Sequence, residues 1–191
     1  MNSLSTPRLL LRRWRAEDRE PFHLISSDPR VMEYFPACLT RAESDATAGR
    51  IEDHFERHGF GLWAAELLGT GELAGYIGLW TPRFEAHFTP CVEIGWRLGA
   101  RFWGQGLATE GAREALRYGF EEARLDEIVS FTVPANARSI RVMEKLGMRR
   151  DREGDFDHPA LAEGHPLRRH VLYRLRAEEY RERARRAGRA I

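Results

Sequence analysis

The chain is poor in lysine and cysteine, and each scarcity limits what the protein can be. Lys145 is the only lysine, so arginine carries nearly all of the positive charge. Lysine and arginine together number 30 against 29 aspartate and glutamate residues, and the formal net charge of +1 argues against a nucleic-acid or membrane surface as the main partner. Cys38 and Cys91 lie far apart in the sequence and lack a metal-type spacing, which is typical of a reduced protein.

Long hydrophobic runs are also missing. No run approaches the roughly 20 apolar residues of a transmembrane helix. Near the N-terminus, Leu9 to Leu11 are followed at once by Arg12 and Arg13, so the apolar core of a signal peptide is absent. We therefore expect a cytoplasmic protein. A hydrophobic content of 42% is enough for a substantial core, and 191 residues suit one domain.

Hydrophobic periodicity and turn residues predict a mixed α/β domain with one central, partly antiparallel sheet of about seven strands flanked by helices. We expect this domain to span residues 1–176 and residues 177–191 to form a polar helical tail. Asp28 before Pro29 predicts a short helix, and Thr40 followed by Glu43 forms a capping box for a longer one. The expected order is strand 8–14, helices 16–25, 29–35 and 40–58, strands 60–68, 73–80 and 91–98, a helix ending near 123, strand 128–133, helix 136–146, strands 149–155 and 170–175, and helix 178–188.

The stretch from Arg101 to Glu110 is the clearest single indication of a ligand site. It is a glycine-bearing turn between a predicted strand and a predicted helix, where backbone N–H groups at the positive end of a helix dipole suit a phosphate. Gly104 and Gly106 would let an anion approach the backbone and would permit positive φ. The turn lacks the Gly-Lys-Ser/Thr ending of a Walker motif, and Thr109 replaces the third glycine of the dinucleotide fingerprint. A glycine turn without a ligand is the alternative.

Three motifs together resemble the GNAT superfamily of N-acetyltransferases, over a stretch running from Arg8 to Leu175. The strand Val92 to Leu98 looks like the family's fourth strand, and Arg-x-x-Gly-x-Gly resembles its pyrophosphate loop. The segment that starts at Asn136 resembles the family's Asn-x-x-Ser…Glu-Lys-Leu-Gly-Phe pattern. The Glu-Ile-Gly-Trp strand looks most like the branch that contains the ribosomal-protein N-terminal acetyltransferases, the RimJ/RimL type. The resemblance implies a sheet splayed between the fourth and fifth strands, with the pantetheine arm of acetyl-CoA lying between them.

The activity implied by this resemblance is transfer of an acetyl group from acetyl-CoA, the cosubstrate, to a primary amine such as a protein or peptide N-terminus, by direct attack in a ternary complex. An acyl-CoA-binding module with little or no catalytic activity is the alternative. No metal is expected, because His54 and His58 lack a third ligand and the His-Glu-x-x-His pattern. Residues 28–41 and 157–165 are expected to set the acceptor, since loops carry specificity. A homodimer is left open.

The resemblance also assigns roles to single residues. Glu93 would be the base that takes the amine's proton, directly or through a water, although an outward-turned or ion-paired carboxylate would explain it too. Many such enzymes have a tyrosine acid where this chain has Met143, and Ser139 is a weaker substitute. Asn136 would bond the pantetheine region, and asparagine is also favoured as a helix N-cap. The cofactor-binding residues implied are Ile94, Gly95, Trp96, Leu98, Arg101, Phe102, Trp103, Gly104, Gln105, Gly106, Leu107, Ala108, Thr109, Asn136 and Ser139.

Overall fold

The computed structural model describes residues 3–188, which form two compact units. The first unit comprises residues 3–80 and 94–115, and the second comprises residues 81–93 and 116–188. The predicted mixed α/β class is confirmed, with eight strands instead of about seven, because a short extra strand forms near the N-terminus. Within the described residues, no helix is long and apolar enough to cross a membrane.

The strands of the first unit form an antiparallel series in chain order. They are β1 (Leu4–Ser5), β2 (Leu9–Arg12), β3 (Leu62–Leu67) and β4 (Leu73–Trp80), with β5 (Glu93–Leu98) as the neighbour of β4. Gly75 lets β4 and β5 approach closely. Its φ is +139°, and a Cβ there would lie 2.0 Å from the carbonyl oxygen of Arg97, so the position requires glycine.

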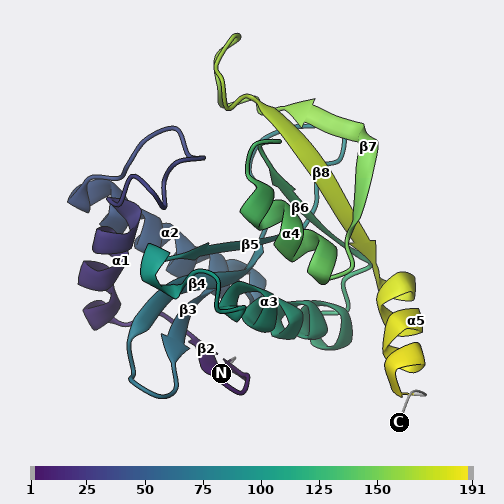
Figure 1. Ribbon diagram of the computed structural model, residues 1–191, viewed down its shortest axis with the longest axis horizontal. Helices are drawn as coiled ribbons and strands as arrows, with labels where there is room; N and C mark the ends of the chain where they lie inside the picture. The colour runs from purple at the N-terminus through teal and green to yellow at the C-terminus, as the bar shows by residue number, and fades with distance from the viewer. Residues whose placement is uncertain (1–2, 189–191) are drawn as a thin grey trace. The chain divides into compact units, whose positions relative to one another are not determined.

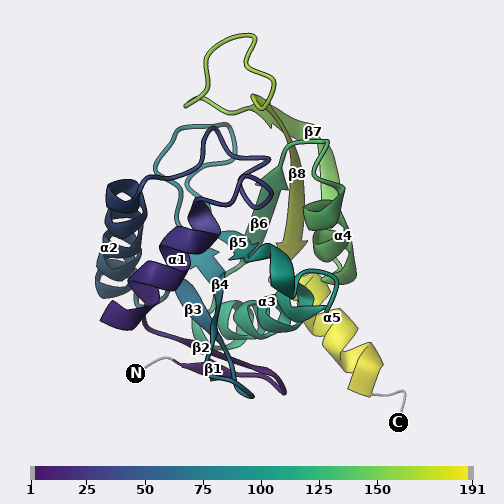
Figure 2. The same ribbon diagram turned by 60° about the vertical axis from the view of Figure 1, so that its left-hand side comes forward.

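The helices of the first unit cover its sheet, and α1 and α2 lie side by side (Figures 1 and 2). The predicted capping box is confirmed at the start of α2. The Thr40 hydroxyl accepts a hydrogen bond from the Glu43 N–H, and the Glu43 carboxylate accepts one from the Thr40 N–H. The helical elements are η1 (Ala16–Asp18), α1 (Arg19–Ser26), α2 (Arg41–His58), η2 (Ala100–Phe102) and α3 (Leu107–Arg117), and the last two residues of α3 belong to the second unit.

The predicted helix over residues 29–35 is wrong, because the chain forms turns there. The Asp28 carboxylate accepts a hydrogen bond from the Arg30 N–H at 2.9 Å and pairs with the Arg30 guanidinium at 2.7 Å, which closes a turn instead of capping a helix. Val31 and Met32 pack with Ile25 in a small apolar cluster. The segment is therefore held by its own turn and by two buried side chains.

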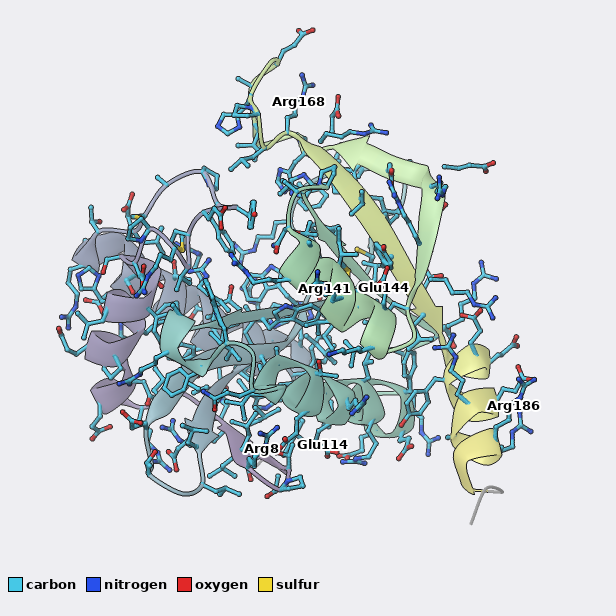
Figure 3. The ribbon with its side chains drawn as sticks, viewed as in Figure 1. Arg8, Glu114, Arg141, Glu144, Arg168 and Arg186 are labelled. Atoms are coloured by element: carbon cyan, nitrogen blue, oxygen red, sulfur yellow. The ribbon has the colours of Figure 1, made fainter. Side chains whose placement is uncertain are left out.

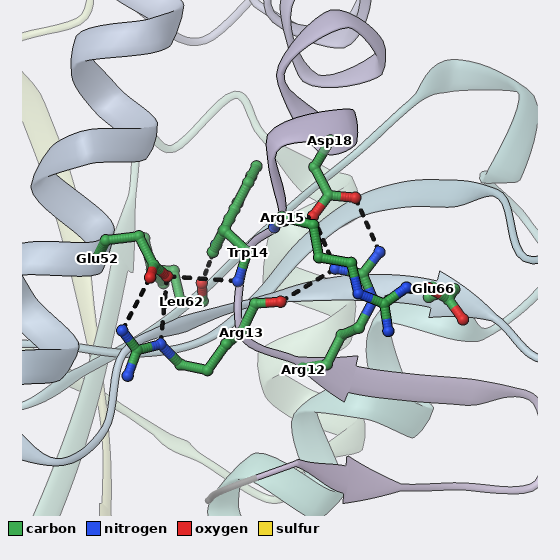
Figure 4. Close-up of polar contacts among 8 residues, drawn as sticks. All are labelled: Arg12, Arg13, Trp14, Arg15, Asp18, Glu52, Leu62 and Glu66. Atoms are coloured by element: carbon green, nitrogen blue, oxygen red, sulfur yellow. Dashed lines mark hydrogen bonds and ion pairs between the residues drawn. The ribbon is translucent and has the colours of Figure 1, made fainter.

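A network of arginine–carboxylate pairs lies beside β2 (Figure 4). Arg12 is only 6% exposed. Its guanidinium donates to the two carboxylate oxygens of Asp18 at 2.7 and 2.8 Å, and its Nε donates to Glu66 at 2.6 Å. Two carboxylates therefore satisfy one buried cation, an arrangement that is strongly destabilised when one partner is removed.

The second unit is built on three antiparallel strands in the order β6 (Glu127–Thr132), β8 (Arg169–Arg176) and β7 (Arg149–Asp157). Glu93, the first residue of β5, pairs in parallel register with Val129 of β6. The predicted strand splay beyond this pair stays a prediction. The helical elements are η3 (Tyr118–Glu122), a π-helical turn that continues the predicted helix, α4 (Ala137–Lys145) and α5 (Ala177–Gly188).

The polar C-terminal helix α5 is tied to the second unit by side-chain contacts, including those of Tyr180 and Arg183. The Tyr180 ring stacks on Phe120 with centroids 4.8 Å apart, and its hydroxyl donates to Glu121 at 3.0 Å. Arg183 donates to the Gly147 carbonyl oxygen. The boundary between the domain and its expected tail, at residue 176, stays a prediction.

Candidate functional site

The loop expected to bind pyrophosphate is a tight turn that opens α3. Gly104 and Gly106 have φ values of +74° and +80°, a conformation that strains any residue with a side chain. Because α3 starts at Leu107, directly after Gly106, the first N–H groups of the helix lie at this loop, and they have no partner inside the helix. Combined with the positive end of the helix dipole, this local geometry suits an anionic group.

Arg8, which is distant in sequence, forms a hydrogen bond with the backbone of the glycine loop. Its Nη1 donates to the Gln105 carbonyl oxygen at 2.9 Å, and its guanidinium pairs with Glu110 at 2.6 Å. Figure 3 shows Arg8 beside α3. The pair with Arg8 offsets the charge of Glu110, which would otherwise stand unpaired in the first turn of the helix. Sequence reasoning missed Arg8, because 97 residues separate it from Gln105.

The side chains of the loop are largely engaged with the protein itself. Arg101 pairs with Glu72 at 3.0 Å and lies over the Phe102 ring, 4.6 Å from its centroid. Trp103 donates from its indole nitrogen to the Leu98 carbonyl oxygen at 2.8 Å. The loop therefore offers its backbone more readily than its side chains, and a cofactor contact of Arg101 stays a prediction.

Glu93 lies partly buried at the start of β5, and burial raises the pKa of its carboxyl to about 8. Among residues 3–188, no ion pair involves Glu93, so the alternative of an ion-paired carboxylate does not apply in this structure. A carboxyl with this pKa is mostly protonated at pH 7 and ionises just above it. It can therefore exchange a proton with a bound amine near neutral pH.

Cys91 lies two residues before Glu93 and has a very different character. Burial, and then the nearby carboxylate of Glu93, raise the pKa of its thiol to about 12. The thiol is therefore protonated near neutral pH and is a poor nucleophile, since only the thiolate attacks readily.

Asn136 is the N-cap of α4. Its side-chain oxygen accepts a hydrogen bond from the Ser139 N–H at 3.2 Å, and its amide nitrogen donates to the hydroxyls of Thr132 at 3.0 Å and Ser139 at 3.2 Å. The N-cap interpretation is confirmed, while contacts of Asn136 and Ser139 with a cofactor stay predictions. Met143 is fully buried, so the position of the usual tyrosine is used for packing.

The polar residues of the late loop are held by local contacts. The Asp155 carboxylate pairs with Arg150 at 2.5 Å and accepts from the Leu172 N–H at 3.2 Å. The His158 and His165 rings each accept a hydrogen bond from the backbone N–H two residues later. These contacts are those of a structured loop between β7 and β8.

His54 and His58 belong to the packing of α2. The His54 ring is hydrogen-bonded through Nδ1 to the Phe60 carbonyl oxygen at 2.8 Å. It stacks between His58 and Trp80, with both centroid distances 4.3 Å. The spacing of four residues therefore brings the His54 and His58 rings together on one face of α2, where they stack.

Arg97 is a second feature that sequence reasoning passed over. It lies on β5 among the expected cofactor-binding residues and is 9% exposed. The available signal was a second charged residue in a mostly apolar strand, two positions after Gly95 and four after Glu93. Only the structure shows, however, that the Arg97 side chain is buried and forms no ion pair with a described residue.

Comparisons with known proteins agree with one another. The model of the acetyltransferase (GNAT) domain family matches residues 8–149. The uncharacterized N-acetyltransferase YnaD of Bacillus subtilis is 32% identical over 150 residues, which cover 78% of this chain and 83% of that protein. The FsC-acetyl coenzyme A-N(2)-transacetylase of Aspergillus fumigatus is 33% identical over 160 residues, 76% of this chain and 64% of that protein.

A solved structure extends the likeness to the fold. The GNAT-family acetyltransferase from Bacillus anthracis superposes with a TM-score of 0.77 at 30% identity, covering 93% of this chain and 100% of that one. The region matched by the family model covers most of the chain and includes β5, the glycine loop and α4 with its N-cap Asn136. The chain therefore belongs to the GNAT family and is an acetyl-CoA-dependent N-acetyltransferase.

Proposed function

We propose that this enzyme acetylates a primary amine by direct attack in a ternary complex, with Glu93 as the general base. The observation that carries the proposal is the Glu93 carboxyl, whose pKa burial raises to about 8. An amine acceptor arrives mostly as ammonium and must lose a proton before it can attack. A base of this pKa accepts that proton far more readily than an ordinary surface carboxylate does.

In the proposed reaction, the amine nitrogen attacks the thioester carbonyl carbon, and the carbon–sulfur bond then breaks. The amine's proton passes to Glu93, directly or through a water, and the leaving thiolate of CoA takes up a proton. Because Met143 cannot donate a proton, Ser139 is the proposed relay: its hydroxyl donates to the thiolate and regains a proton from solvent. Backbone N–H groups of β5 near Gly95 would stabilise the negative charge on the thioester oxygen.

We assign the binding of acetyl-CoA to backbone groups of two segments. Residues 94–96 and Leu98 of β5 would bind the pantetheine amides, and residues 101–109 would bind the pyrophosphate. Support for the second assignment comes from the positive φ of Gly104 and Gly106 and from the start of α3 at Leu107. Asn136 and Ser139 would contribute through their polar side chains.

The proposal is tested by the acetyl-CoA-dependent release of free CoA against an acceptor panel. The panel holds peptides that begin with serine or alanine, free amino acids, polyamines and aminoglycosides. We expect acceptor-dependent release with one class, accompanied by acetylation of its amine in mass spectrometry. Acetyl-CoA that binds but is never transferred to any amine would contradict the proposal and favour the acyl-CoA-binding module.

A further inference from the structure

Arg97 is a buried cation without a counter-ion. Its Nη1 donates to the Ser26 hydroxyl at 3.2 Å, and its guanidinium carbon lies 4.2 Å from the centroid of the Phe35 ring and 5.3 Å from that of Tyr76. Its Nε is buried and has no hydrogen-bond partner. Among residues 3–188, these are the hydrogen-bond and ring contacts of its guanidinium, and it forms no ion pair with a carboxylate.

Arg12 in the same unit shows how this chain otherwise satisfies a buried arginine (Figure 4). The two residues are similarly buried, at 6% exposure for Arg12 and 9% for Arg97. Arg12 meets Asp18 through two hydrogen bonds and Glu66 through a third. Arg97 has one hydroxyl and two ring faces in place of those carboxylates.

The contacts of Arg97 leave its burial incompletely compensated. A guanidinium does not lose its proton in a protein, so it cannot respond to burial by becoming neutral. The faces of Phe35 and Tyr76 attract the cation, but a ring face does not accept the in-plane hydrogen bond of the Nε–H. A carboxylate would provide both the missing charge and an acceptor for that edge.

We propose that Arg97 binds a carboxylate of the acceptor, so that the acceptor class is a primary amine carrying a carboxylate. This inference rests on the proposed function, in which Glu93 receives the amine's proton. Glu93 and Arg97 are four positions apart on β5, so their side chains project from the same face of the strand. Four steps along a strand span about 13 Å. The spacing favours a short peptide or an ω-amino acid over an α-amino acid.

The segment 28–41, which is expected to set acceptor specificity, contributes Phe35 to the contacts of Arg97. Phe35 lies on the turn segment after α1, which Val31 and Met32 anchor to Ile25. The Leu39 N–H also donates to the Ser26 carbonyl oxygen at 2.9 Å. The ring of Phe35 is thereby held against Arg97, while the buried Nε of the guanidinium has no acceptor among the described residues.

Matched acceptor pairs test the proposal. We would compare γ-aminobutyrate with γ-aminobutyramide, and trialanine with trialanine amide, using wild type and Arg97→Met. In wild type, kcat/KM should be at least about tenfold higher for the free acid than for its amide, because the amide leaves the cation unpaired. Arg97→Met should lose this preference while its affinity for acetyl-CoA is unchanged. Weaker acetyl-CoA binding by the variant would overturn the proposal, since the anion would then belong to the cosubstrate.

Thermal unfolding without acceptor distinguishes a ligand site from a structural role. Arg97→Met should unfold at or above the temperature of wild type, because it removes a charge that has no counter-ion. Arg12→Met is the matched control and should unfold well below wild type, because it leaves Asp18 and Glu66 without their cation. A loss of stability in Arg97→Met as large as in Arg12→Met would overturn the proposal.

The remaining outcomes separate this inference from the proposed function. Acetyl transfer at equal rates to acids and amides in wild type would overturn the inference and leave the proposed function intact. Absence of transfer to every amine would overturn the proposed function. In that case, a rise in the unfolding temperature of wild type with the free acids, absent in Arg97→Met and with the amides, would still support the carboxylate site. No such rise would overturn it.

Discussion

Glu93 and Arg97 lie on one strand, and burial acts on them in different ways. The carboxyl of Glu93 can become neutral, and burial accordingly raises its pKa to about 8. The guanidinium of Arg97 stays charged and can only be stabilised by what surrounds it. The same physical cause thus gives one residue the properties of a base and leaves the other requiring an anion.

The pH dependence of activity tests the role of Glu93. Because the base acts in its ionised form and its pKa is raised to about 8, kcat/KM of wild type should rise with pH and level off above about 8. Glu93→Gln should lower turnover by about 100-fold or more and remove this rise, with acetyl-CoA affinity unchanged. Steady-state kinetics over a pH series provide the measurement.

The control for this experiment is Glu85→Gln, which changes an exposed glutamate that the proposed reaction does not use. It should keep the wild-type profile. An unchanged turnover in Glu93→Gln would remove Glu93 from the mechanism, and the same pH rise in both variants would assign the titration to the acceptor amine.

At the scale of elements, the glycine loop leads directly into α3, which starts at Leu107. The loop places two glycines at positive φ directly before the helix, and Arg8 holds it through the Gln105 carbonyl oxygen. A Cβ at Gly106 would meet only Arg8 Nη2, at an ordinary contact distance of 3.7 Å. The conformation of Gly106, and not its packing, therefore makes the position depend on glycine.

Gly106→Val should abolish measurable acetyl-CoA binding in titration calorimetry while the protein remains folded. A β-branched residue at φ near +80° is strained by roughly 1–3 kcal/mol. In our proposal its side chain would also stand where the pyrophosphate approaches. Gly49→Ala on α2 is the matched control, because nothing lies within 4 Å of its added Cβ. That variant should bind acetyl-CoA normally. Wild-type affinity in Gly106→Val would refute the loop assignment.

At the scale of the whole molecule, the raised pKa of Glu93 links its proposed role as a base to the stability of the fold. The unfolded chain releases this proton near pH 4.5, whereas the folded protein retains it up to about pH 8. Between these values the folded state binds more protons, so the free energy of unfolding from this group falls as pH rises and levels off above about 8. The carboxyl is therefore retained in the folded enzyme at a cost to stability under alkaline conditions.

Glu93→Gln should remove this dependence. Relative to wild type, its unfolding temperature should rise progressively between pH 5 and about pH 8.5, with the largest difference at the alkaline end. Scanning calorimetry of both proteins in matched buffers gives the comparison. A constant difference across the pH range would mean that the pKa of Glu93 is not raised by folding.

Local signals in the sequence were sufficient for much of this protein. The capping box at Thr40, the N-cap at Asn136 and the bounds of the strand at 73–80 all depend on residues close in sequence, and the structure confirms them. The glycine loop and its two neighbouring motifs indicated the family for the same reason, since each motif is a short run of residues with fixed spacing.

Tertiary structure decided what depends on distant residues and on burial. Asp28 and Pro29 carry a helix-start pattern, yet a side-chain turn and the packing of Val31 and Met32 made the segment irregular. The contact of Arg8 with Gln105 joins residues that no local pattern connects. Desolvation raises the pKa of Glu93, and the fold buries the Nε of Arg97 without an acceptor. The order of residues indicated the family and with it acetyl transfer, whereas burial raised the pKa of Glu93 and, in our proposal, sets the charge of the acceptor.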